Sequence, residues 1–157
     1  MIIIEDTRNK IGKHEKLNSD LIKSGHIVIR NKLIAGDYAR ADSQRVLIDT
    51  KQDWVEVAGN LCGKQHARFR RECELAQQCK LQLIVLVEED CEPQDWIVPR
   101  RKSGKPITQV KPQIMAKIIK TMEAKYAVRF LHCDKKATAQ KIIELLKGEN
   151  DNDFEII

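Results

Sequence analysis

The sequence has few aromatic residues and no long apolar run. Aromatic side chains make up 4% of the 157 residues. Its longest apolar runs, such as Leu83 to Val87, are far shorter than the roughly 20 residues that a membrane-spanning helix needs. The amino terminus, MIIIEDTRNK, lacks the positive segment and the small-residue cleavage site of a signal peptide. We therefore expect a soluble protein with no membrane contact.

The cysteines are odd in number and form no C-x-x-C pair. This spacing argues against a zinc site and against a disulfide framework, and it predicts a reducing compartment. We expect a cytoplasmic protein, or a nuclear one if the source is eukaryotic, in which most cysteines pack as small core residues. The five positions are Cys62, Cys73, Cys79, Cys91 and Cys133.

Several catalytic patterns are also absent. No Ser/His/Asp set and no glycine-rich phosphate loop occurs, which excludes the serine hydrolase and NTPase classes. His26, His66 and His132 lack the spacing of metal ligands, and we expect His14 to be exposed. The chemistry must therefore come from other residue types.

What the chain does have is charge. Residues of both signs make up 32% of it, hydrophobic residues make up 42%, and the net charge is +5. This composition is typical of a globular protein, and its basic balance favours a polyanionic partner. We expect one domain over residues 1–148 and an acidic tail over 149–157.

Apolar periodicity predicts alternating strands and helices. Period two or continuous apolar runs predict strands at 1–5, 26–30, 33–38, 45–51, 81–88 and 127–133. Period three to four predicts helices at 14–24, 53–63, 66–79, 112–125 and 138–147, with Asp53 and Glu56 in a capping-box pattern. Early strands in a hairpin and later strands separated by helices predict a three-layer α/β/α fold with a mixed central sheet.

Residues 91–111 differ in kind from the rest of the chain. They hold three prolines and Gly104, and we expect a long basic loop. A loop of this length in a compact domain is usually functional or disordered. Its cations could hold DNA phosphates without reading sequence, and the alternative is a disordered surface loop. The cations in question are Arg100, Arg101, Lys102 and Lys105.

The most informative stretch is GDYARADSQRVLIDTK, residues 36–51. It contains Asp37, Asp49 and Lys51, with a turn-rich segment between the two carboxylates. In a β-hairpin, Asp49 and Lys51 would project from the same face of their strand as Leu47, and Asp37 would be brought near them. An Asp-x-Lys tripeptide taken alone is more often a solvated strand end, so its neighbours decide its meaning.

Asp6, at the end of the first strand, could join the other two carboxylates. Converging carboxylates repel one another unless a cation holds them, and Mg²⁺ bound by one or two carboxylates resolves that conflict. Asp37 and Asp49 are the candidate metal ligands, with the Thr50 carbonyl as a third. Lys51 would orient or help to deprotonate water, or stabilise charge on a phosphate.

These residues resemble the XPF/MUS-type nuclease domain of the PD-(D/E)xK, restriction-endonuclease-like superfamily. The resemblance lies in D-x-R (Asp6, Arg8), in G-D-Y beginning at Gly36, and in V-x-I-D-x-K ending at Lys51. It continues through GKQHARFRRE (63–72) and, with the order of strands and helices, covers roughly residues 1–148.

The resemblance implies a metal-dependent DNA endonuclease, active on flap, fork or branched DNA in repair or recombination. It implies that Asp6, Asp37, Asp49 and Lys51 are catalytic and that Mg²⁺, or Mn²⁺ in its place, is the cofactor. It also implies a homodimer through 112–125 and 138–147, or a partner subunit that supplies DNA specificity. The cations that would contact DNA beside the cut are Arg8, Lys64, Arg68, Arg70 and Arg71.

The chain departs from the family pattern in two motifs. The family has Glu-Arg-Lys where this chain has Asp49-Thr50-Lys51, and it has Glu where Asn9 follows Arg8. Family members also commonly carry a tandem helix-hairpin-helix module that these 157 residues leave no room for. A second hypothesis therefore stays open, namely a catalytically silent DNA-binding or scaffold subunit of the same fold.

Overall fold

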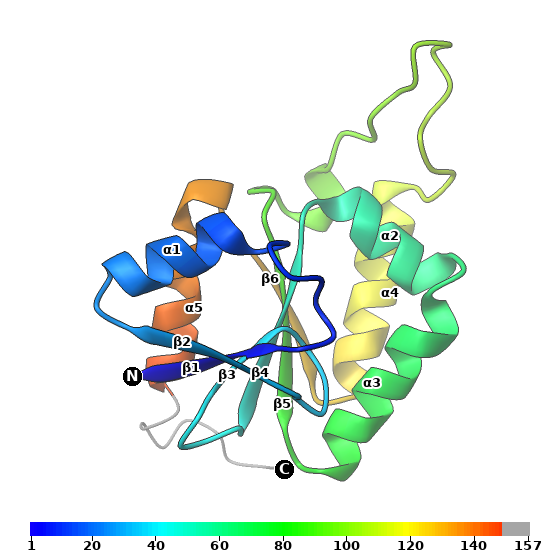
Figure 1. The fold of residues 1–157 in the computed structure, drawn as a ribbon. Helices are drawn as coiled ribbons and strands as arrows, with labels where there is room; N and C mark the ends of the chain where they lie inside the picture. Colours follow the sequence, from blue (N-terminus) through cyan, green and yellow to red (C-terminus); the bar gives the residue numbers. More distant parts are fainter. Residues whose placement is uncertain (149–157) are drawn as a thin grey trace.

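The structure, a computed structural model, describes residues 1–148, and the predicted acidic tail lies outside them (Figure 1). The strands are β1 (Ile2–Asp6), β2 (Ile27–Asn31), β3 (Tyr38–Arg40), β4 (Val46–Lys51), β5 (Gln82–Val87) and β6 (Val128–His132). The α-helices are α1 (Glu15–Lys23), α2 (Trp54–Cys62), α3 (His66–Gln78), α4 (Pro112–Lys125) and α5 (Thr138–Lys147). Two 3-10 turns are η1 (Pro93–Asp95) and η2 (Lys135–Ala137).

The strands form one mixed sheet in the order β2-β1-β3-β4-β5-β6. β3 pairs antiparallel with β1 and β4, while β1 with β2, β4 with β5, and β5 with β6 are parallel. Each parallel pair is joined by a connection that contains helix, as parallel crossovers require. The predicted mixed sheet is confirmed.

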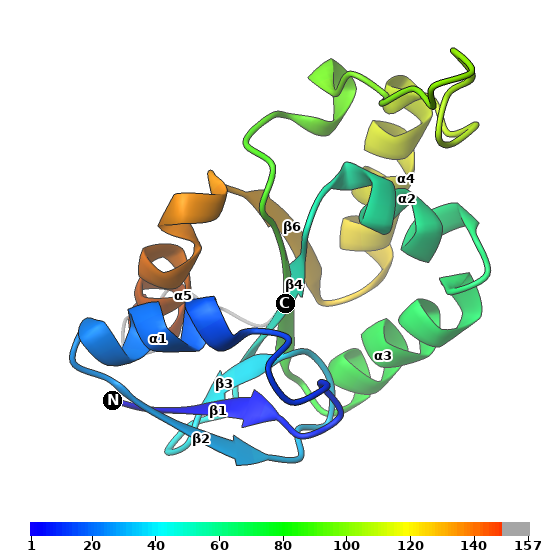
Figure 2. The ribbon, with the colours of Figure 1, turned by 45° about the horizontal axis from the view of Figure 1, so that its top comes forward.

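Helices cover the two faces of the sheet unequally. Figure 2 shows α1 and α5 on one side and α2, α3 and α4 on the other. Leu21 of α1 and Ile142 of α5 pack with Ile48 of β4 in one core, while Leu47 belongs to the core of the opposite face. The three-layer α/β/α arrangement is therefore as predicted.

The alternation predicted for β4 is correct, and it determines where the charged side chains lie. Leu47 packs on the α2–α3 side, so Asp49 and Lys51 project to that same side. The cap predicted for α2 is also present, because a side-chain oxygen of Asp53 accepts a 2.9 Å hydrogen bond from the Glu56 N–H. Helix α2 thus starts directly beyond the end of β4.

The strand predicted at 33–38 is wrong. Residues 34–37 form bends, Leu33 lies in no regular element, and β3 begins at Tyr38. Two long-range hydrogen bonds replace strand pairing there: the Asp6 N–H donates to the Asp37 carbonyl at 2.8 Å, and the Leu33 N–H donates to the Asp6 carboxylate at 2.9 Å. Asp37 therefore lies at the entrance to β3 and not inside a strand.

The region 91–111 has more structure than the sequence predicts. Its first part forms η1, in which Pro93 is buried, and Trp96 is also buried. Its second part folds back on itself, with a bridge between Arg100 and Pro106. Most of the segment is the long basic loop that the sequence predicts, and η1 and the bridge are the exceptions.

The cysteines are all free, as predicted, but fewer than expected lie in the core. Cys73 and Cys133 are buried, Cys91 is half-buried, and Cys62 and Cys79 are exposed. The exposed pair lies at the carboxyl-terminal ends of α2 and α3, beyond the last core-facing residue of each helix. Among residues 1–148, no helix is long and apolar enough to span a membrane.

Candidate active site

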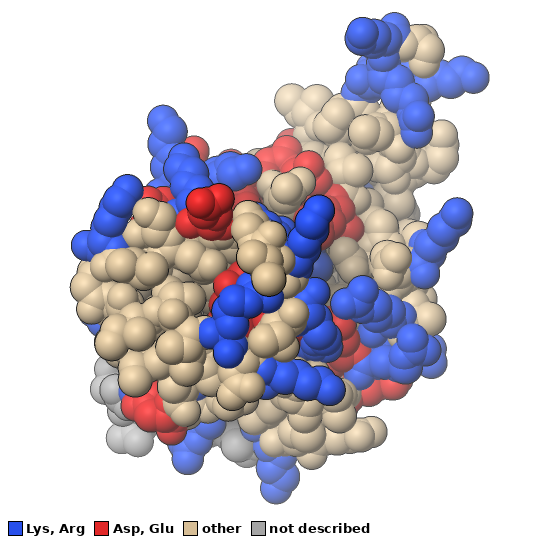
Figure 3. All heavy atoms as spheres, viewed as in Figure 1, with Lys and Arg blue, Asp and Glu red and all other residues tan. Residues whose placement is uncertain are grey.

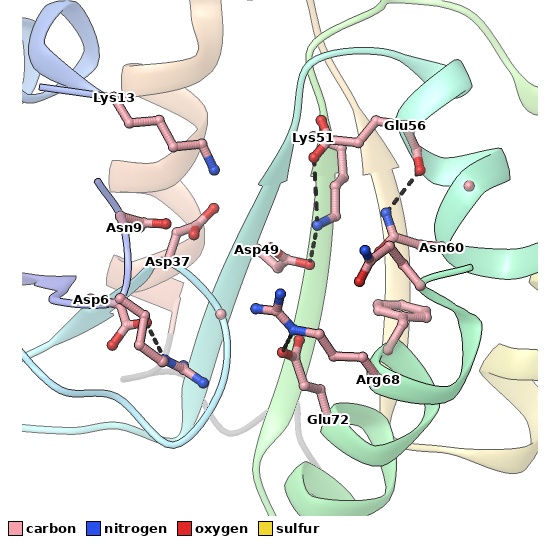
Figure 4. Close-up of a pocket in the computed structure, with 15 residues that line it drawn as sticks. Asp6, Asn9, Lys13, Asp37, Asp49, Lys51, Glu56, Asn60, Arg68 and Glu72 are labelled. Carbon is pink, nitrogen blue, oxygen red and sulfur yellow. Dashed lines mark hydrogen bonds and ion pairs between the residues drawn. The ribbon is translucent and has the colours of Figure 1, made fainter. Parts of the chain in front are cut away.

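A cleft with a volume of about 400 Å³ opens between the end of β4, the β1–α1 connection and helices α2 and α3. Figure 4 shows carboxylates and cations pointing into it from both sides. All four residues predicted to be catalytic line this cleft, although they come from three separate segments of the chain. They are Asp6, Asp37, Asp49 and Lys51.

Asp37 is fixed to β4 through its side chain. Its Oδ2 accepts hydrogen bonds from the Thr50 N–H at 2.9 Å and from the Thr50 hydroxyl at 2.6 Å. Burial alone would raise the pKa of Asp37, but these bonds, with the Asn9 side chain and His14, bring it below its ordinary value. Asp37 is therefore an ionised carboxylate at neutral pH.

Asp49 and Lys51 form a buried ion pair. The Lys51 Nζ lies 3.0 Å from the Asp49 Oδ2, although that oxygen accepts no well-aligned hydrogen bond from residues 1–148. Burial raises the pKa of Asp49 to about 7, Lys51 opposes that rise, and Asp37 adds to it. Burial alone would lower the pKa of Lys51. The negative charges of Asp49 and, to a lesser extent, Glu56 outweigh burial, so the pKa of Lys51 lies above its ordinary value.

Asp6 has a different environment. Its Oδ2 pairs with the Arg8 Nε, and its Oδ1 accepts the hydrogen bond from Leu33. Both oxygens are thus engaged by the protein. Within residues 1–148, no three His, Cys, Asp or Glu side chains are grouped closely enough to hold one metal ion. The three acids thus line one cleft, as the sequence predicts, but Asp6 braces the 31–37 segment and does not join the other two around one point.

His14 was expected to be exposed, and this expectation is wrong. Its side chain is 12% exposed, and its Nε2 lies 3.9 Å from the Asp37 Oδ2. The imidazole also packs edge-on against the Tyr38 ring, with 5.7 Å between the ring centroids. The short polar run before α1 gave no apolar period from which this burial could be predicted.

Gly36 places Asp37 by allowing two chain segments to touch. Its φ is +74°, and a Cβ there would lie 3.0 Å from the Ile48 carbonyl oxygen. The adjacent Asp37 N–H donates to that same oxygen at 2.7 Å. Gly36 therefore forms a bend that lies directly against the β4 backbone.

The predicted DNA-binding cations lie in three places. Arg8 lines the cleft, held by Asp6 and by the Leu33 carbonyl. On α3, Arg68 lines the cleft with its Nε 3.4 Å from Glu72, while Arg70 pairs with Glu74 and lies outside it. Lys64 and Arg71 are exposed outside the cleft, and the cations Arg100, Arg101, Lys102 and Lys105 are on a separate projection (Figure 3).

Comparison with known proteins identifies the fold. The sequence matches no protein-family model and no curated protein. The structure is similar to XPF from Aeropyrum pernix, with a TM-score of 0.69 and 19% identity over 100% of this chain and 65% of that one. A second structure, of XPF from the same organism in complex with DNA, has a TM-score of 0.66 and 18% sequence identity, over 95% of this chain and 64% of that one. The chain has the XPF fold.

This result confirms the predicted restriction-endonuclease-like architecture. At 18–19% identity it concerns the fold alone, and the chain spans about two thirds of the length of the XPF chains that it matches. The roles of the cleft residues therefore depend on the geometry of this chain's own cleft.

Several cleft residues were not predicted. Asn9 and Lys13 line the β1–α1 side, and Glu56, Asn60 and Glu72 line the helical side. Glu56 and Asn60 are one helical turn apart, as are Arg68 and Glu72, so helical spacing places each pair on one face. That periodicity could have indicated these residues once α2 and α3 were known to border the cleft.

The raised pKa of Asp49 predicts a pH-dependent stability. The value of about 7 in the folded protein exceeds the ordinary 3.8, so between these pH values the folded state keeps a proton that the unfolded chain has lost. Stability therefore falls as pH rises from about 4 to about 7, by up to about 1.4 kcal/mol per pH unit.

In EDTA, urea unfolding at several pH values should show that the stability of Asp49→Asn lacks this dependence on pH. An Asp95→Asn control should keep it, and parallel curves for wild type and Asp49→Asn would contradict the assignment.

Substitution of Gly36 tests the close approach to β4. Gly36 and Gly25 both have positive φ, but a Cβ at Gly25 would meet nothing within 4 Å. Gly25→Ala should therefore cost only backbone strain, about 1–2 kcal/mol. Gly36→Ala should cost about 1–3 kcal/mol more, because it also crowds Ile48. Urea unfolding measures both, and equal losses would mean that the contact with Ile48 is unimportant.

Proposed function

We propose that this XPF-type domain is a Mg²⁺-dependent DNA endonuclease that hydrolyses phosphodiester bonds. The observation that carries the proposal is the buried Asp49–Lys51 pair facing an ionised Asp37 across an open cleft. A carboxylate buried at a cost to folding is typical of functional sites. The XPF structure solved with DNA has the same fold, which supports DNA as the ligand.

The donor atoms suit a hard divalent cation. Asp49 presents a buried carboxylate oxygen that lacks an aligned hydrogen bond, and Asp37 presents an ionised carboxylate. Because the N–H and C=O of a strand residue point the same way, the Thr50 carbonyl lies on the side where its N–H meets Asp37. Bound there, Mg²⁺ would supply an activated water and charge neutralisation at the phosphate.

Lys51 would act as a cation. Asp49 and Glu56 keep its pKa raised, so the amine is protonated at neutral pH and cannot take a proton from water. An ammonium beside the cleft can instead stabilise the charge that develops on the phosphate. This favours one of the roles that the sequence left open for Lys51.

DNA would cross the cleft between Arg8 and α3. Asp6, with which Arg8 pairs, and Arg68 lie on opposite walls (Figure 4), and the side chains of Arg8 and Arg68 are 40% and 66% exposed. Lys64, Arg70 and Arg71 extend the basic surface along α3. Contacts of this kind bind phosphates regardless of sequence, so cleavage would depend on DNA shape, and flap, fork or branched DNA is the substrate class that we propose.

Removal of Lys51 or Asp37 tests the chemistry. Lys51→Ala and Asp37→Asn should each lower Mg²⁺-dependent cleavage of labelled flap, fork and duplex DNA by at least about 100-fold, because the first removes a cation beside the phosphate and the second removes a ligand of the proposed metal. Far-ultraviolet circular dichroism checks folding, and Asp95→Asn is the matched control. Wild-type rates in both variants would refute the site.

Metal binding can be measured by thermal unfolding, without an activity assay. After EDTA treatment, Mg²⁺ or Mn²⁺ should raise the melting temperature of the wild type, because a ligand of the folded state stabilises it. The increase should be absent in Asp37→Asn. If the wild type binds DNA but neither gains stability with metal nor cuts, the silent DNA-binding subunit is the better description.

We also propose a homodimer through α4, α5 and β6. A groove of about 540 Å³ runs beside β6, which is an edge strand of the described sheet. Its apolar floor includes Ile119 and Phe130, and charges of both signs, Glu123 and Lys141 among them, also line it. A surface with both signs can be complementary to a second copy of itself across a two-fold axis.

A charge placed in this groove should break the dimer. Ala116 lines the groove on α4, so Ala116→Arg would bury a cation at the interface. Light scattering should give a dimeric mass for the wild type and a monomeric mass for the variant. The control is Thr121→Arg, an exposed position on α4 outside the groove, which should remain dimeric. A monomeric wild type would exclude the homodimer.

A further inference from the structure

Residues 97–110 form a hairpin that projects beyond α2 and α4 (Figure 1). We call it the arm. Its two sides meet at an isolated antiparallel bridge between Arg100 and Pro106. The Arg101 N–H donates to the Lys105 carbonyl at 2.8 Å, and the Gly104 N–H donates to the Arg101 carbonyl at 2.9 Å, which closes a turn. Gly104 has a φ of +82°, a backbone conformation that glycine adopts readily in turns.

The base of the arm is anchored in the core. Trp96 is 3% exposed, and Val98 and Val110 pack against the core cluster on the α2–α4 side. A further backbone bond, from the Ile107 N–H to the Pro99 carbonyl at 2.9 Å, joins the two sides near their base. The direction in which the arm projects is therefore set by the fold.

The arm is strongly and uniformly basic. Residues 97–111 contain no Asp or Glu, and the cations Arg100, Arg101, Lys102 and Lys105 are all exposed. Within residues 1–148 none of these four forms an ion pair with a carboxylate, although Arg100 donates to the Gly104 carbonyl at 2.7 Å. Figure 3 shows their charge gathered at the end of the projection.

The positive charge of the arm is separate from that of the cleft. Helix α2, which the arm projects past, contains no Lys or Arg. Of the cleft cations, Arg8, Lys51 and Arg68 are paired with a carboxylate, and within residues 1–148 only Lys13 is not, whereas none of the four arm cations is. The arm is therefore a basic surface separate from the cleft.

We propose that the arm is a β-ribbon that enters a groove of duplex DNA and contacts phosphates of both strands, away from the cleavage cleft. A two-stranded ribbon fits the major groove, and cations from both of its strands can reach the phosphates on either side. The arm would hold the duplex and set which bond reaches the cleft. This inference rests on the proposed function only in taking DNA as the ligand.

Removing the four charges of the arm tests the inference. The variant Arg100→Gln, Arg101→Gln, Lys102→Gln, Lys105→Gln should bind a fluorescent duplex at least about tenfold more weakly than the wild type. The slope of log affinity against log salt should fall by about 3 to 4, since each lost phosphate contact releases about 0.9 fewer counterions. The Michaelis constant for cleavage should rise, with little change in the rate at saturating DNA.

A matched variant removes four exposed lysines elsewhere, namely Lys23→Gln, Lys32→Gln, Lys117→Gln and Lys136→Gln. It loses the same net charge and should change duplex affinity far less than the arm variant does. Because the ribbon is proposed to enter a groove, the loss in the arm variant should also be larger for duplex than for single-stranded DNA.

The outcomes separate this inference from the proposed function. If the arm variant binds and cuts duplex as the wild type does, or if it loses no more affinity than the matched variant, the arm does not bind DNA and the nuclease proposal stands. An equal loss for single strands would overturn groove entry. If the arm variant loses affinity for duplex but the wild type never cuts DNA, the arm inference holds and the nuclease proposal fails.

Discussion

The buried pair of Asp49 and Lys51 is the interaction around which the centre of the domain is arranged. A carboxylate near the end of a central strand would be costly to ionise without a partner, and Lys51, two residues on and on the same face, supplies one. Compensation is incomplete, since the pKa of Asp49 stays raised. Asp49 is 6% exposed although it lines the cleft, so the fold keeps a carboxylate that a cation would stabilise further.

The three acids of the cleft have the same side chain but different environments, and these environments give them different roles. Asp6 has both oxygens engaged and braces a loop. Asp37 receives two hydrogen bonds from Thr50 and is held ionised. Asp49 lacks an aligned donor and is held closer to its neutral form. A bound cation adds most to the stability of a carboxylate whose oxygens have few partners in the protein. Asp49 and Asp37 are therefore better suited than Asp6 to hold a metal.

Local pattern was enough to predict the sheet, the helices and the placement of Asp49 beside Lys51, because alternation in β4 and apolar period in α2 and α3 are short-range signals. It failed where distant segments decide conformation. The strand expected at 33–38 is replaced by bends because Asp6 bonds the Leu33 N–H across 27 residues. His14 is buried only because Tyr38 and Asp37 lie against it. Such contacts leave no periodic trace in the sequence.

The distribution of paired and unpaired cations would matter for binding of the proposed DNA ligand. A cation already paired with a carboxylate gives up part of that interaction when it binds a phosphate, so Arg8, Lys51 and Arg68 of the cleft would contribute little net affinity. The exposed cations of the arm would lose no such partner and would release counterions from the DNA. Affinity and chemistry would then reside on separate surfaces: the arm would hold the duplex, and the cleft, most of whose cations are already paired, would act on the bond presented to it.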